Sequence, residues 1–172
     1  AAILPVFQEY LKDNKSRAYD LISNLQNGFL FASGIVAVII FFLAPLFLYI
    51  TVPGFSDSER NLTVLLTRIM LLSPIFLGLS SILSSVIQSF QRFFAYALAP
   101  IFYNVGIIMG ILIFVPLFGV IGLGMGVVLG ALLHWLIQLI SISQIGFRPH
   151  LFIPRINIGM KKVLSLSFPR VL

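Results

Sequence analysis

Long apolar runs separated by short polar segments dominate this chain. Residues 21–56 and 93–147 contain no Asp, Glu, Lys or Arg, and the run over 62–90 contains a single one, Arg68. Because a helix rises about 1.5 Å per residue, about 20 apolar residues cross the hydrocarbon core of a bilayer. The pattern therefore predicts an all-α fold, a polytopic bundle of transmembrane helices.

The lengths of these runs divide the chain into spans. The run over 93–147 is too long for one span and suits two, joined by a hairpin at 116–119 (PLFG). The segment 12–20 (KDNKSRAYD) alternates in charge and is expected to be a solvated turn. We treat 1–172 as a single transmembrane domain that is a fragment of a longer protein. The approximate spans are 1–11 (the end of a helix), 21–52, 62–90, 94–115, 119–145 and 163–172 (the start of a helix).

Composition supports a membrane protein and the charges give its orientation. Hydrophobic residues make up 59% and charged residues 9% of the chain, against about 25% charged in soluble domains. The net charge of +6 does not indicate nucleic-acid binding, because the basic residues lie in the connections. Segments 12–20, 91–92 and 146–162 hold eight of them, whereas loop 53–61 holds only Arg60. The positive-inside rule therefore places the first three segments in the cytoplasm.

Polar residues of the span over 62–90 gather on one face. Ser73, Ser80, Ser84 and Gln88 fall within about 80° of one another on a helical wheel. Such a face lines a transport cavity or packs against another helix. Together with Asn104, these four residues are the candidate cavity-facing, substrate-binding residues. Pro74 is expected to kink this helix, with Ser73 helping to satisfy the freed carbonyls.

Two further polar groups fall inside spans. Arg68 lies about 12 Å from the middle of its helix, so we expect it to reach the outer interface rather than to act in transport. His134 and Gln138 continue a ladder of residues four apart, formed by Gly122, Gly126 and Gly130. Either they form a proton or ligand site, or they bond within a close helix–helix contact. We expect the second, because small residues at this spacing let backbones approach closely.

Enzymatic chemistry finds no support in the residues. The sequence offers no paired carboxylates, no nucleophile–base pair and no cluster of metal-ligating side chains. The glycines of 122–130 do not fit G-x-G-x-x-G, and the absence of cysteine excludes thiolate metal sites. We therefore expect neither a cofactor nor a metal, and no catalytic residue.

Six short motifs, in order, resemble the MurJ (MviN) family of lipid II flippases. They are Pro5-Val6-Phe7 with Glu9-Tyr10, Val52-Pro53-Gly54-Phe55, Leu66-Thr67-Arg68-Ile69-Met70, Gln91-Arg92-Phe93, Ala97-Leu98-Ala99-Pro100 with Asn104, and Leu151–Asn157. They are spread over essentially the whole chain. Two positions depart from the family pattern: His134 stands where Gln is usual, and Gln91 replaces a small residue.

The resemblance implies a fourteen-helix transporter of the multidrug/oligosaccharidyl-lipid/polysaccharide exporter superfamily in the bacterial cytoplasmic (inner) membrane. This chain would supply the end of helix 2, helices 3–6 and the start of helix 7, most of the N-terminal lobe. The implied substrate is lipid II, moved to the outer leaflet by alternating access, and the implied partners are lipid II and membrane lipids. The family's pyrophosphate-binding arginines lie mainly on helices outside this chain. A polysaccharide or drug exporter and a non-transporting membrane scaffold are the alternatives.

Overall fold

The computed structural model describes residues 3–148, 150, 153–154 and 158–167, and every regular element in them is a helix. The elements are α1 (Ile3–Asp13), α2 (Lys15–Thr51), α3 (Asp57–Met70), α4 (Leu72–Ser89), α5 (Phe93–Met109), the π-helix η1 (Gly110–Phe114), α6 (Val115–Phe118), α7 (Ile121–Ser143) and α8 (Ile158–Ser167). Within the described residues, four helical segments are long and apolar enough to cross a membrane. They are Lys15–Thr51, Asp57–Ser89, Phe93–Phe118 and Ile121–Ser143.

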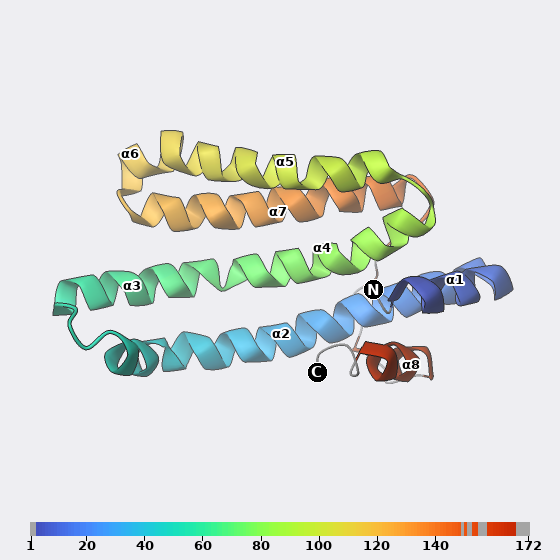
Figure 1. Cartoon of the computed structure of the whole chain (residues 1–172), viewed down its shortest axis with the longest axis horizontal. Helices are drawn as coiled ribbons and strands as arrows, with labels where there is room; N and C mark the ends of the chain where they lie inside the picture. Colours follow the sequence, from blue (N-terminus) through green and yellow to red (C-terminus); the bar gives the residue numbers. More distant parts are fainter. Residues whose placement is uncertain (1–2, 149, 151–152, 155–157, 168–172) are drawn as a thin grey trace.

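The long helices lie side by side (Figure 1). Helix α7 packs against α5 on one side and against α4 on the other, and α4 in turn contacts α2. Helices α1 and α8 gather at the end of the bundle where α4 turns into α5, and Lys162 of α8 forms an ion pair of 2.6 Å with Glu9 of α1. The α2–α3 connection and α6 lie at the opposite end. The orientation predicted from the charges assigns these two ends to opposite sides of the membrane.

Helix α2 begins six residues earlier than the sequence indicated. Only Asn14 separates it from α1, and its side chain accepts a hydrogen bond of 2.8 Å from the backbone N–H of Ser16. This is an ordinary N-cap, and the Asp13–Arg17 ion pair of 3.0 Å bridges the junction. The predicted solvated turn over 12–20 is therefore wrong, because its alternating charges lie along two helix ends.

The earlier start changes the environment of four polar residues in α2. They lie in the third and fourth turns of the helix instead of in its first, and all four are buried. Asn27 donates hydrogen bonds to the carbonyls of Ser23 (2.8 Å) and His150 (2.7 Å). The four residues are Ser23, Asn24, Gln26 and Asn27.

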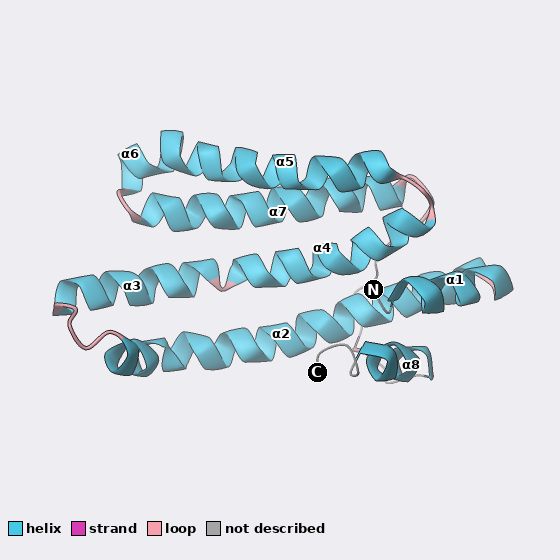
Figure 2. Ribbon diagram, viewed as in Figure 1, coloured by secondary structure: helices cyan, strands magenta, loops and turns pink. Residues whose placement is uncertain are grey.

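Proline shapes the middle of the second long helix. The rod over Asp57–Ser89 breaks at Leu71, and Pro74 falls in the first turn of α4, where a missing N–H is tolerated. The break is visible as a short loop between α3 and α4 (Figure 2). The predicted role of Ser73 is wrong, since its buried hydroxyl makes no hydrogen bond within the described residues.

The tight turn between α6 and α7 comes later than expected. The helix continues through Pro116 to Phe118 and ends at Gly119, whose φ of +61° is accessible to glycine at little cost. The π-helix η1 ends at Phe114, two residues before Pro116, which has no N–H to donate to the carbonyl of Leu112. Residues 116–118 thus extend the span, and Gly119-Val120 forms the reversal.

Buried apolar side chains concentrate at the end of the bundle that holds α1 and α8. Phe7, Ile22, Leu83, Ile142 and Phe147 are all completely buried there. The second half of α2, in contrast, exposes large apolar side chains along its length. Such an apolar outer surface is suited to contact with lipid or with other membrane helices. Most of the family-like motif over 151–157 and the residues 168–172 lie outside the described residues.

Candidate functional site

A seam of glycines joins α5 and η1 to α7. A Cβ atom built on Gly126 would lie 2.6 Å from the Cα of Gly110, and one built on Gly106 would collide with the backbone of Gly130. Gly122 meets the backbone of Phe114 in the same way. Contacts this short leave no room for any side chain. The predicted small-residue packing face is confirmed, and it brings two membrane helices into backbone contact.

The next residues of the ladder face α4 instead. Ser80 and the Nδ1 atom of His134 share a hydrogen bond of 2.7 Å, and the Ser84 hydroxyl donates to Oε1 of Gln138 at 2.8 Å. The change of partner follows from helix geometry, because four residues rotate by about 400° and each step of four drifts about 40° around α7. The ladder therefore turns from α5 towards α4 as it descends.

These two hydrogen bonds define what the serine face does within this chain. Ser80 and Gln138 are almost completely buried between α4 and α7. The expectation that His134 bonds within a helix–helix contact agrees with this geometry. The hydrogen bonds of Ser80 and Ser84 to α7 likewise agree with the expectation that the serine face packs against another helix. A role of this face in a transport cavity stays a prediction.

The other candidate residues are not brought together. Gln88 is half-buried near the end of α4. Asn104 is exposed on α5, and its side chain donates a hydrogen bond of 3.0 Å to the carbonyl of Pro100 in the same helix. Ser73 is buried some two turns before Ser80 on α4. The five candidates therefore form no single site in the described part of the chain.

Arg68 takes a partner that the sequence did not suggest. Its Nε–H donates to the carbonyl of Phe41 in α2 at 3.1 Å, and its guanidinium lies over the Phe41 ring, 4.5 Å from the centroid. Phe41 precedes the end of α2 by ten residues, about 15 Å along the helix. Arg68 therefore does not extend to the outer interface as expected.

The sequence explains why this carbonyl is available. Residue 45 would normally donate its backbone N–H to the carbonyl of Phe41, but it is proline and has no N–H. Arg68 supplies the missing donor from the neighbouring helix. The signal in the sequence was the four-residue spacing between Phe41 and Pro45, but only the pairing of α2 with α3 identifies the donor.

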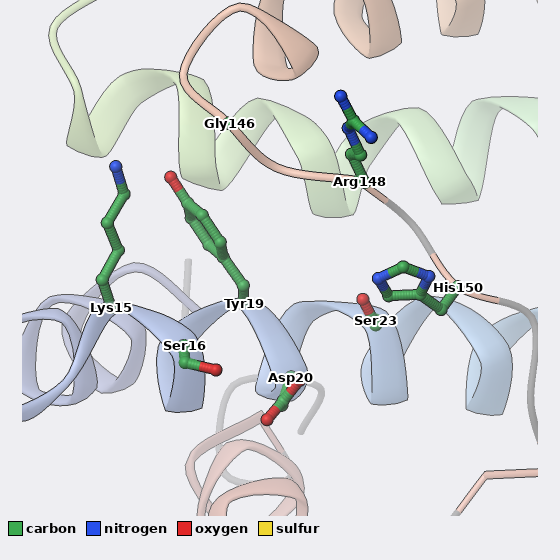
Figure 3. A pocket seen from close by; sticks show the side chains of 8 residues that line it. All are labelled: Lys15, Ser16, Tyr19, Asp20, Ser23, Gly146, Arg148 and His150. Carbon is green, nitrogen blue, oxygen red and sulfur yellow. The ribbon is translucent and has the colours of Figure 1, made fainter.

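A polar cavity lies at the end of the bundle that carries the basic connections (Figure 3). It has a volume of about 460 Å³ and is formed where the loop after α7 crosses the first turns of α2. Tyr19 holds this loop by donating a hydrogen bond of 2.7 Å to the carbonyl of Ile145. Except for Ser23, the lining residues fall in two separate segments that the sequence predicts to be cytoplasmic, 12–20 and 146–162, and no pattern in the sequence indicates that they meet. The charged residues that line the cavity are Lys15, Asp20 and Arg148.

The described residues contain no group of three or more His, Asp or Glu side chains placed to hold a metal ion. The chemistry available to these elements is packing, hydrogen bonding and the binding of polar or charged groups. Ser80 and His134 form a serine–histidine pair at hydrogen-bond distance, but the Ser80 hydroxyl is completely buried between α4 and α7, where no substrate reaches it.

Comparison with known proteins identifies the family. The family profile described as "Lipid II flippase MurJ" matches residues 1–172, the whole chain. The chain belongs to the MurJ family. The members of this family are described as flippases, which are transporters rather than enzymes, and the four apolar helices of this chain fit its place in a bacterial inner membrane.

Individual members of the MurJ family agree with this assignment. A probable lipid II flippase MurJ of Buchnera aphidicola subsp. Acyrthosiphon pisum is 29% identical over 179 residues, covering 99% of this chain and 34% of that protein. A probable lipid II flippase MurJ of Rhizobium tropici is 28% identical, covering 98% of this chain and 33% of that protein. The chain thus spans about one third of the length of these relatives.

Proposed function

We propose that the full-length protein containing this segment moves lipid II, the undecaprenyl-pyrophosphate-linked peptidoglycan precursor, across the bacterial inner membrane. The observation that carries the proposal is the match of the MurJ family profile along all 172 residues. In this proposal the segment contributes most of the N-terminal lobe, and substrate is bound mainly by residues of other helices.

The packing of the segment supports a role as a lobe that moves as one body. In alternating access, two lobes rock about a central site while each keeps its internal contacts. Backbone contact along the glycine seam and two buried interhelical hydrogen bonds tie α4, α5 and α7 together. Helices joined this closely are expected to move together rather than to slide.

The test uses bacteria whose own lipid II flippase is depleted. Expression of the full-length protein is expected to restore growth and to make lipid II accessible to an enzyme added outside the cells. The matched variants are Gly126→Leu, which clashes with α5, and Gly34→Leu, whose Cβ position has no neighbour within 4 Å. We expect only the first to lose activity.

Three results would contradict the proposal, and each points to a different conclusion. If the protein reaches the membrane in normal amount but lipid II stays inaccessible from outside, the lipid II assignment is wrong. Export of a different polysaccharide or of a drug by the same protein would favour the exporter alternative. Absence of any transported molecule would favour the scaffold.

A further inference from the structure

Two neighbouring cavities run along α2 from the basic end of the bundle. The first is the 460 Å³ polar cavity of Figure 3. The second, about 260 Å³, lies between α2, α4 and α7 and is lined chiefly by Leu30, Phe76, Leu79 and Trp135. His150 lines both cavities, so they adjoin one another.

The first cavity has the chemistry of an anion site. Lys15 and Arg148 supply positive charge from two different segments, and Ser23 supplies a hydroxyl group, whereas the hydroxyl of Ser16 points away from the ends of Lys15 and Arg148. Asp20 also lines the cavity, but in Figure 3 its carboxylate points away from the ends of Lys15 and Arg148. A phosphate group with several oxygen acceptors suits such a set of donors.

The second cavity is apolar but contains two polar atoms without partners. The Oε1 atom of Gln26 and the Nε1 atom of Trp135 are buried and make no hydrogen bond within the described residues. Gln26 as a whole is only 7% exposed. Leaving such groups unpaired is costly. In a ligand with apolar chains, an ester oxygen would accept a hydrogen bond from the Nε1–H of Trp135, whereas Oε1 of Gln26 requires a donor such as a hydroxyl group.

Together the two adjoining cavities extend along α2 over a length close to the thickness of one leaflet. Lys15 and Leu30 are fifteen residues apart on α2, about 22 Å along its axis. Half of a bilayer, headgroups included, measures about 20–22 Å. The positive-inside rule places the charged cavity at the cytoplasmic headgroups, so the apolar cavity lies at the depth of the acyl chains.

We propose that the two cavities together bind one anionic phospholipid of the cytoplasmic leaflet. Its phosphate would lie between Lys15 and Arg148, and an acyl chain would enter the space beside Trp135. A free phosphate would make no use of the apolar cavity. The large sugar–peptide headgroup of a peptidoglycan precursor exceeds a cavity of 460 Å³. The site is separate from transport and does not depend on which molecule is moved.

The test uses the full-length protein in phosphatidylcholine nanodiscs, with every tryptophan except Trp135 replaced by phenylalanine. Trp135 is the single tryptophan of this segment and lines the apolar cavity. Phosphatidylglycerol with brominated acyl chains is added in steps, and brominated phosphatidylcholine is the comparison. We expect the anionic lipid to quench Trp135 fluorescence at a mole fraction at least fivefold lower.

Matched charge variants locate the headgroup. The double variant Lys15→Gln/Arg148→Gln is expected to reduce the preference for phosphatidylglycerol to less than twofold. Arg17→Gln/Lys161→Gln removes the same charge at two exposed positions outside the cavity, and should keep the preference. Both variants should retain the thermal stability of the parent protein.

Three outcomes would overturn the proposal. Equal quenching by both brominated lipids would show that no anionic site exists beside Trp135. Equal loss of preference in both double variants would show general surface attraction. Displacement of phosphatidylglycerol by stoichiometric undecaprenyl pyrophosphate would show a substrate site. The first two outcomes leave the lipid II assignment unchanged, whereas the third would support it.

Discussion

At the scale of residues, Gly126 and Gly110 set the distance between α7 and the α5–η1 helix. Their Cα atoms lie so close that a Cβ on either would fall within 2.6 Å of the other backbone. Neighbouring backbones cannot yield as the end of a flexible side chain can, so the site has little capacity to relax. The effect of one added methyl group should be large along this seam and negligible at an open position such as Gly34.

The first prediction concerns Gly126→Ala. We expect it to lower the free energy of unfolding by about 1–3 kcal/mol, because the helices must separate to admit the methyl group. Gly34→Ala, in the open middle of α2, is the control and should leave stability unchanged or slightly raised. Thermal unfolding of the full-length protein in detergent measures both. Equal melting temperatures would mean that α5 and α7 are not in backbone contact.

The second prediction concerns the hydrogen bond from Ser84 to Gln138. A double-mutant cycle with Ser84→Ala and Gln138→Leu should give a coupling free energy of about 0.6–1.7 kcal/mol, the range for such bonds in membranes. The same cycle with Ser81→Ala in place of Ser84→Ala provides the control, since Ser81 lies on the exposed side of α4. A coupling free energy no larger than that of the control would show that the bond between Ser84 and Gln138 does not stabilise the protein.

At the scale of elements, α2 and α3 are joined where a proline interrupts the hydrogen bonding of α2. Pro45 leaves the carbonyl of Phe41 without its helical donor, and Arg68 supplies one at 3.1 Å. An arginine in the membrane is costly unless it is paired. Arg68 of α3 therefore gives the Phe41 carbonyl a hydrogen-bond donor, and this carbonyl of α2 gives the guanidinium an acceptor.

The third prediction follows from this exchange. Arg68→Gln should lower stability by about 1–2 kcal/mol but leave transport largely intact, since the residue contacts α2 rather than substrate. In a Pro45→Ala background the cost of Arg68→Gln should fall, because an alanine at this position restores the N–H that bonds to the carbonyl of Phe41. Chemical unfolding of the four variants gives the coupling. Loss of transport by a stable Arg68→Gln protein would assign Arg68 a functional role.

Local signals in the sequence predicted the glycine seam and the existence of the long helices. The four-residue spacing of Gly122, Gly126 and Gly130 is visible in the sequence, and the close contact with α5 follows from it. The junction at Asn14 was missed because alternating charges are compatible with a turn and with paired helix ends. The choice between them depends on a single capping side chain.

The hydrogen-bond partners on neighbouring helices could not be predicted from the sequence. Ser80 and Ser84 were identified as one polar face, but their bonds to His134 and Gln138 depend on which helix lies opposite. The same holds for Arg68 with Phe41 and for the cavity between Lys15 and Arg148. Each of these pairs joins segments that are distant in the chain, and no local pattern specifies them.

At the scale of the whole molecule, the segment is well packed at its basic end and open along its outer surface. The completely buried core joins α1, α2, α4 and α7 near the basic connections, whereas the far half of α2 exposes Phe42 (72%) and Ile50 (69%). In the proposed function, such a lobe is expected to move as a body while its apolar flank contacts lipid or other helices. This arrangement suits the N-terminal lobe of a MurJ flippase.

The measurement that tests this account most directly is translocation of fluorescent lipid II by the purified full-length protein in sealed vesicles. Accessibility of the headgroup to a membrane-impermeant quencher reports the leaflet. We predict that the protein equilibrates lipid II across the bilayer, that Gly34→Leu does the same, and that Gly126→Leu does not. Lipid II that stays in its original leaflet with a folded protein would contradict the central claim.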